Sequence, residues 1–70
     1  MPTFSFTLVR GGDDLTVELE NENTVREVAQ RLAKEGFVDG TQMRWATNRF
    51  VKEDPISVMA HAVVSIRFAK

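Results

Sequence analysis

The single histidine and two polar residues before it are the one set whose types could support nucleophilic catalysis. His61 follows Ser57 by four residues, and Asp54 lies a little further upstream. A catalytic triad needs a buried, mutually oriented set beside an oxyanion pocket. The stretch around Asp54-Pro55 instead has the composition of a short surface connector. We therefore predict no catalytic residues and a protein that is not an enzyme.

Two further sets could bind small ligands in principle. Asp13, Asp14 and Glu18 offer carboxylates to a cation, but they lack the spacing of a calcium loop. Arg10-Gly11-Gly12 lacks the spacing of a phosphate-binding loop and does not lead into a helix, so its amides would not converge on an anion. The sequence therefore predicts neither a metal site nor a cofactor.

Length and charge narrow the range of functions. The chain has 70 residues, which is enough for one small domain spanning residues 1–70. A formal charge of −1 argues against bulk electrostatic binding of nucleic acid or of a membrane surface. Apolar runs stay far below the ~18 residues of a membrane span. The lack of cysteine fits a reducing compartment, so we predict a cytoplasmic protein.

The first half of the chain predicts a hairpin followed by a helix. Apolar residues alternate with polar ones in residues 3–9 and 15–20, and the Gly-Asp-rich stretch between them is typical of a turn. Thr24 and Glu27 have the spacing of a capping box at a helix start. An apolar stripe and a terminal Gly36 complete the predicted helix.

The second half predicts a turn at Asp39-Gly40 and then three more strands. Met43 and Trp45 alternate with Gln42 and Arg44, so we expect the first pair to face the core and the second pair to face solvent. A tight turn at 47–48 leads to a short strand over 49–52, which Asp54-Pro55 should end. We expect residues 56–61 to form an irregular connector and residues 63–68 the last strand.

The predicted core consists of the apolar residues on the inward-facing sides of these strands and of the helix. It consists of Phe4, Phe6, Leu8, Leu15, Val17, Leu19, Val25, Val28, Leu32, Met43, Trp45, Phe50, Ile56, Val64, Ile66 and Phe68.

This order of elements resembles the ubiquitin-like β-grasp family along nearly the whole chain. The strongest local match is the helix start, Thr24-Val25-Arg26-Glu27-Val28, with Lys34-Glu35-Gly36 at the helix end. The resemblance implies an α+β fold: a mixed sheet of about five strands with one helix across one face. It further implies that the first and last strands lie side by side and parallel, which leaves the second strand as a free edge.

Two departures from the family pattern bear on function. The chain ends in Ile66-Arg67-Phe68-Ala69-Lys70, without the Gly-Gly tail that conjugating and sulfur-carrying members use. Arg44 and Arg67 stand at strand positions where ubiquitin presents an apolar patch to its receptors. The resemblance therefore implies a non-conjugating member that the usual ubiquitin receptors do not bind.

The exposed sheet face is the predicted site. We expect a basic half near Arg44 and Arg67 and an acidic half near Glu18 and Glu20, with Trp45 as an anchor if it is partly exposed. The predicted function is that of a non-enzymatic adaptor or accessory subunit that docks a protein partner on this face. An ordinary solvated sheet face is the competing interpretation. The predicted partner-binding residues are Ser5, Thr7, Gln42, Arg44, Trp45, Ser65 and Arg67.

Two alternatives remain open at this stage. The basic half-face could contact nucleic acid, although near-neutral charge and the expected lack of exposed aromatic residues count against it. The chain could also be a modifier or sulfur carrier whose diglycine tail is absent. For the oligomeric state we expect a monomer or a weak dimer through the free edge of the second strand.

Overall fold

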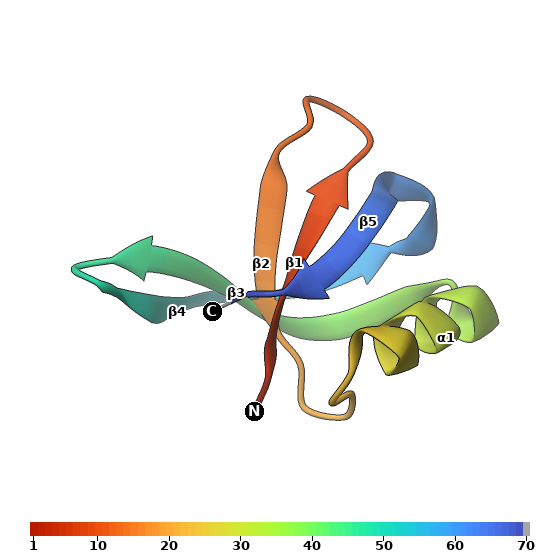
Figure 1. Ribbon diagram of the computed structural model, residues 1–70, viewed down its shortest axis with the longest axis horizontal. Helices are drawn as coiled ribbons and strands as arrows, with labels where there is room; N and C mark the ends of the chain where they lie inside the picture. Colours follow the sequence, from red (N-terminus) through yellow and green to blue (C-terminus); the bar gives the residue numbers. More distant parts are fainter. Residues whose placement is uncertain (70) are drawn as a thin grey trace.

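A computed structural model describes residues 1–69 as five strands and one α-helix (Figure 1). The elements are β1 (Thr3–Leu8), β2 (Asp14–Glu18), α1 (Val25–Glu35), β3 (Phe37–Ala46), β4 (Arg49–Met59), the 3-10 turn η1 (Ala60–Ala62) and β5 (Val63–Phe68). The strand order is β4-β3-β2-β1-β5, and every pairing is antiparallel. The fold is thus α+β, with a five-stranded antiparallel sheet and one helix.

No helix in residues 1–69 has the length and apolarity that a membrane span requires.

The predicted first hairpin is confirmed. Phe4 lies opposite Val17 and Phe6 opposite Leu15, so the apolar residues of β1 and β2 share one face. The turn between the strands contains Gly11 and Gly12, both with positive φ. This backbone conformation suits glycine, because glycine lacks the Cβ that would clash there.

The predicted capping of the helix is also confirmed. Thr24 Oγ1 accepts the N–H of Glu27 at 3.1 Å, and Glu27 Oε1 accepts the N–H of Thr24 at 3.0 Å. These two bonds satisfy N–H groups that have no partner within the helix. Gly36 closes the other end with φ 86°, and its N–H donates to the carbonyl of Leu32. The helix then passes directly into β3.

The prediction that Asp54-Pro55 ends the fourth strand is wrong. β4 continues from Arg49 to Met59 because the pairing with β3 changes register between Thr41 and Met43. Thr41 lies opposite Pro55 and Met43 opposite Lys52, so β4 carries one extra residue in a bulge. Proline is tolerated at a bulge on an edge strand, where a missing N–H costs little.

The longer β4 also reverses the predicted direction of β5. It carries the chain to the far end of the sheet, and η1 then turns it into β5 beside β1. The predicted mixed sheet with parallel first and last strands is therefore wrong: the two strands are neighbours, but they are antiparallel. The prediction of β2 as a free edge is wrong as well, since β2 lies between β1 and β3. The edges are β4 and β5.

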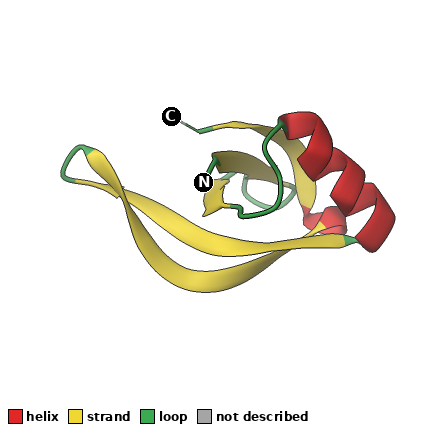
Figure 2. Ribbon diagram, turned by 90° about the horizontal axis from the view of Figure 1, so that it is seen from below, coloured by secondary structure: helices red, strands yellow, loops and turns green. Residues whose placement is uncertain are grey.

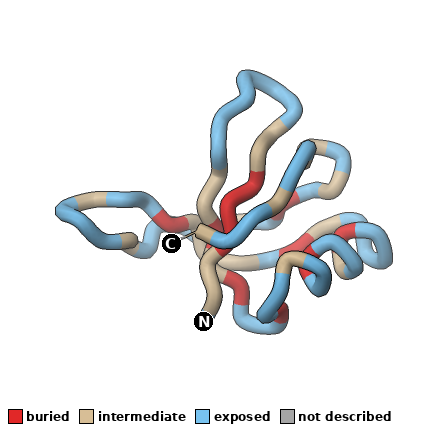
Figure 3. Tube along the Cα trace, in the orientation of Figure 1, coloured by how far each residue is buried: buried red, intermediate tan, exposed pale blue. Residues whose placement is uncertain are grey.

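The core differs from the predicted one in residues of β3, β4 and β5. Val38 and Val58, which were not predicted, are buried beside Phe4, Phe6, Val28 and Leu32. Three predicted core residues are exposed: Trp45 by 57%, Val64 by 66% and Phe68 by 52%. A register shift between Thr7 and Leu8 places Val63, not Val64, against the core. Figure 3 shows the buried segments gathered where β1, β2 and β3 meet near α1.

β3 passes close to the end of β2 at Gly40. The sequence suggested a turn at this position, but Gly40 lies inside β3 opposite Ile56. A Cβ built on it would lie 2.5 Å from the carbonyl oxygen of Glu18 and 2.5 Å from Cγ1 of Val17. A side chain at this position would push β3 away from β2, in the strand pair from which the curved β3–β4 hairpin of Figure 2 extends.

We expect Gly40→Ala to be strongly destabilising. The methyl group would collide with backbone as well as side chains, and such overpacking costs about 1–3 kcal/mol or more. Chemical denaturation followed by circular dichroism would measure the loss.

Gly12→Ala is the matched control. A Cβ there meets nothing within 4 Å, so only the positive φ penalises it, by about 1 kcal/mol. Equal losses from the two substitutions would contradict the close approach at Gly40.

Candidate functional site

The sheet face opposite α1, here called the outer face, is defined by the pairing register. Ser5 pairs with Thr16 and with Arg67, and Thr16 pairs with Met43. Cross-strand partners lie on the same side of a sheet. Phe4 and Phe6 lie on the opposite side, in the core with the helix residues. The predicted site residues Ser5, Thr7, Ser65 and Arg67 therefore all lie on the outer face.

Gln42 and Arg44 do not join them, and the predicted basic half-face is not formed. Val17 pairs with Gln42, which places the even-numbered residues of β3 on the side of the core. β3 begins at Phe37, earlier than the sequence suggested, and its buried Val38 lies in the core. The residues that face the core are therefore those in phase with Val38, not those in phase with Met43. Arg44 Nε instead lies 3.0 Å from Glu53 Oε2, across the β3–β4 hairpin.

Arg67 is tied to its neighbours on the outer face. Its guanidinium donates to Thr7 Oγ1 at 3.0 Å and to Asp14 Oδ2 at 2.7 Å. The Thr7 hydroxyl donates in turn to Asp14 Oδ1 at 3.0 Å. Such an exposed pair contributes at most about 1 kcal/mol of stability. Its effect on recognition is to leave the Arg67 charge largely compensated.

An aromatic corner made of Met43, Trp45 and Phe50 occupies the β3–β4 end of the outer face. The rings of Trp45 and Phe50 meet edge to face, with centroids 4.9 Å apart and planes inclined by 78°. Trp45 is 57% exposed, whereas Met43 is 8% exposed and lies outside the main core. Edge-to-face contact is a favoured geometry for aromatic pairs, so Phe50 holds the indole in place.

The tight turn at the tip of the hairpin fixes this corner. Thr47 and Asn48 have φ values of 53° and 63°, as in the two-residue turns whose twist matches that of a hairpin. They place Arg49 opposite Ala46 and Phe50 opposite Trp45. The turn was predicted from the sequence. Trp45 was placed in the predicted core because it has the same phase as Met43, and the structure instead shows the alternative, an exposed Trp45.

The charged side chains of the hairpin are paired with acidic ones on both sides of the sheet. On the outer face, Lys52 lies opposite Met43, and its Nζ is 3.5 Å from Glu18 Oε1. On the side of the core, Arg44 is paired with Glu53. Neither pair carries net charge, so the corner offers an exposed aromatic surface bordered by the Lys52–Glu18 pair. Chemically, this arrangement can bury an indole against a partner and orient it by rim contacts.

The residues considered for catalysis are not assembled. The Ser57 hydroxyl donates to Asp39 Oδ1 on β3, not to His61. His61 lies in η1, where it lines a hollow of about 390 Å³ with Leu8, Val9, Arg10 and Ala62. Within residues 1–69, no three histidine or carboxylate groups come together as a metal site would require.

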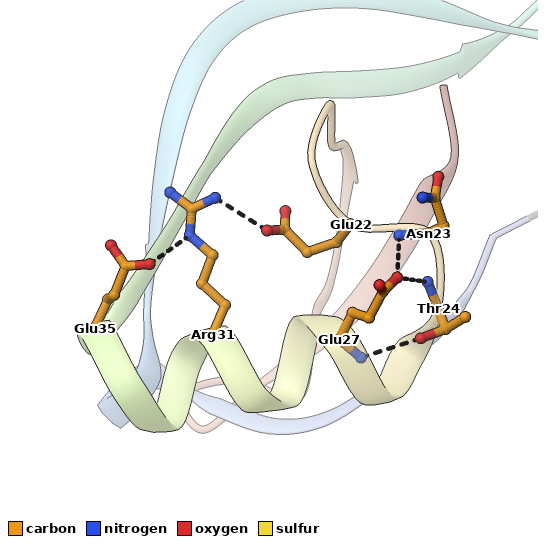
Figure 4. A network of polar contacts seen from close by, with 6 residues as sticks. All are labelled: Glu22, Asn23, Thr24, Glu27, Arg31 and Glu35. Carbon is orange, nitrogen blue, oxygen red and sulfur yellow. Dashed lines mark hydrogen bonds and ion pairs between the residues drawn. The ribbon is translucent and has the colours of Figure 1, made fainter.

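A polar cluster beside α1, shown in Figure 4, anchors the loop between β2 and the helix. Glu22 is 5% exposed, and its Oε2 accepts a hydrogen bond from Arg31 Nη1 at 3.0 Å. Arg31 Nε lies 3.2 Å from Glu35 Oε2, an ion pair without good hydrogen-bond geometry. The Glu27 carboxylate accepts the N–H of Thr24 in the capping box and also accepts the N–H of Asn23 at 2.7 Å. The hydrogen bond to Glu22 raises the pKa of Arg31, so the guanidinium stays charged.

We expect Glu22→Ala to destabilise the fold by about 1–3 kcal/mol, because it leaves a partly buried guanidinium without its main acceptor. Glu35→Ala removes the more exposed partner of the same Arg31 and should cost less than about 0.5 kcal/mol. Urea denaturation of the two variants would give their free energies of unfolding and so show which of the two carboxylates Arg31 depends on. A larger loss for Glu35→Ala would contradict this assignment.

Comparison with family models, with characterised proteins and with solved structures gave no match for this chain.

Proposed function

We propose that this protein is a non-enzymatic protein-binding module, an adaptor or accessory subunit that docks a partner through the aromatic corner. The observation that carries the proposal is the exposure of Trp45 beside a second aromatic ring. The residue is 57% exposed, and its ring meets that of Phe50 edge to face. Tryptophan is one of the side chains enriched among the few residues that carry most of the binding energy at protein interfaces.

The charges near the corner support a partner with a matching apolar pocket rather than a highly charged partner. Lys52 on the outer face is compensated by Glu18, and Arg44 on the other side of the hairpin is compensated by Glu53. Net attraction at long range is therefore small, and affinity must come chiefly from burying the aromatic surface. Thr7, Ser65 and Arg67 lie on the same face of the sheet, on β1 and β5, and Ser5 lies there too but is only 8% exposed. Gln42 and Arg44 lie on the other side and are not part of the proposed surface.

We further propose a cytoplasmic location, which fits the lack of cysteine, and a distant relation to ubiquitin-like proteins. The order of hairpin, capped helix and further strands supports this relation, whereas the antiparallel β5 counts against it.

The test is affinity capture from lysate of the source cells, followed by titration of each recovered protein in purified form. Trp45→Ala should weaken binding at least about 10-fold, as expected for a central interface tryptophan. Met59→Ala serves as the control, since Met59 is also exposed, by 45%, but lies at the other end of β4. A partner whose affinity is unchanged by Trp45→Ala would contradict the proposed surface.

Nucleic-acid binding is the second candidate, because the exposed indole removes one objection to it. Bases stack on exposed aromatic rings in single-strand binders, and a basic side chain, Lys52 opposite Met43, lies on the same face of the hairpin as Trp45. Trp45 is the only tryptophan, so its fluorescence reports directly on the corner. Quenching by oligouridine that weakens steeply with salt would favour this candidate over protein binding. Unchanged fluorescence at low salt would exclude it.

A further inference from the structure

The two edges of the sheet differ in how well they are protected from pairing with another chain. β4 carries Lys52, Glu53, Asp54 and Pro55 together with a bulge, which are devices that discourage edge pairing. β5 has the sequence Val63-Val64-Ser65-Ile66-Arg67-Phe68, with one charge and no proline. It pairs only with β1, and Figure 3 shows much of it exposed. β5 is therefore the edge open to a further strand.

The register shows which backbone groups are free on β5. The N–H of Ala69 donates to the carbonyl of Thr3 on the side of β1. Arg67 and Ser65, two and four residues earlier and opposite Ser5 and Thr7, therefore also point their backbone groups toward β1. In an antiparallel ladder the intervening residues point their backbone groups the other way. The N–H and C=O of Ile66 and Phe68 therefore face the free side, as does the C=O of Val64.

An apolar groove runs between this edge and α1. It has a volume of about 350 Å³ and is lined by Val25, Ala29, Leu32 and Ala33 of the helix region and by Ala60, Val63, Val64, Ser65 and Ile66. Val64 and Phe68 are exposed by 66% and 52%. Phe68 stacks on Phe4 with one side of its ring. The alanines leave room above the edge for a large side chain.

We propose that β5 pairs antiparallel with β5 of a second copy of this chain, with Ile66 opposite Ile66 at the two-fold axis. Ile66 then exchanges both backbone hydrogen bonds with its counterpart, and each Phe68 N–H reaches the carbonyl of Val64 in the other copy. Val64 and Phe68 lie opposite each other across the seam. The Phe68 ring of each copy enters the groove beside α1 of the other.

Charge complementarity favours this register and a second copy as the occupant. Centred on Ile66, the pairing sets Arg67 against Ser65, and no like charges meet. Centred on Arg67, the pairing would oppose two guanidinium groups, which is destabilising in cross-strand positions. The net charge of −1 adds little repulsion between copies. The edge is thus complementary to itself in backbone, apolar side chains and charge.

The available area indicates a weak dimer. A strip one strand long, about 20 Å, and about 20 Å deep across strand and helix gives roughly 400 Å² per copy. Stable interfaces use about 800 Å² per partner, and weak ones fall below about 600 Å². We therefore expect a weak dimer that forms only at high protein concentration.

Sedimentation velocity on the full chain from about 10 µM to about 1 mM tests the proposal. The wild type should shift from monomer to dimer across this range. Val64→Lys combined with Phe68→Lys should remain monomeric, because it sets like charges opposite each other across the seam. Val64→Lys combined with Phe68→Glu removes the same apolar groups but sets opposite charges together, and should restore at least about a 10-fold tighter dimer than the Lys/Lys variant.

The comparison of the two double variants separates the register from a general loss of packing. The positions are four residues apart on one strand, about 13 Å, so they do not pair within a copy. Circular dichroism and the chemical shifts of core residues check that both variants fold. A wild type that stays monomeric at about 1 mM, or a dimer equally stable in both double variants, would overturn the proposal.

Discussion

The close passage of β3 over β2 at Gly40 is the constraint on which the rest of the structure depends. Without a side chain at this position, the strand can approach the Glu18 carbonyl and Val17, and the long hairpin bows around the sheet. That bow brings Val38 and Val58 into contact with Phe4, Phe6 and the helix. It also carries β4 to the end of the sheet from which β5 can return antiparallel to β1. The positions of the two edge strands, β4 and β5, thus depend on Gly40, which the sequence alone suggested was part of a turn.

The sequence predicted the elements whose signals are local, and missed those decided by distant contacts. The hairpin turn at Gly11-Gly12 and the capping box of Thr24 and Glu27 involve neighbours in the chain, and both are confirmed. Pro55 is a strand breaker by its local chemistry, yet an edge position and a bulge accommodate it in β4. Likewise, alternation alone cannot show which face of a strand is buried. Trp45 faces outward because Val38, several residues earlier in β3, sets the phase.

The same shifts redistribute the candidate site. Arg44 and Arg67, expected together, lie on opposite sides of the sheet, and each has an acidic partner. Ser5, Thr7 and Ser65 remain on the outer face with Arg67, and the aromatic corner replaces the predicted basic half. The molecule thus offers two apolar features at different places: the aromatic corner at the β3–β4 end of the outer face and the edge of β5 beside α1. The first supports binding to another protein, and the second supports pairing between copies, so the two can operate at once.

The most direct test of this account is the direction of β5 relative to β1, read from NMR contacts between Hα protons. In an antiparallel sheet, residues of a non-hydrogen-bonded pair bring their Hα protons face to face. The structure predicts strong contacts of this kind between Phe6 and Ile66 and between Phe4 and Phe68. A parallel arrangement, as in the ubiquitin-like fold, would lack both contacts and would pair the start of β1 with the start of β5. Observing that pattern would contradict the topology, the open β5 edge and the placement of Trp45 together.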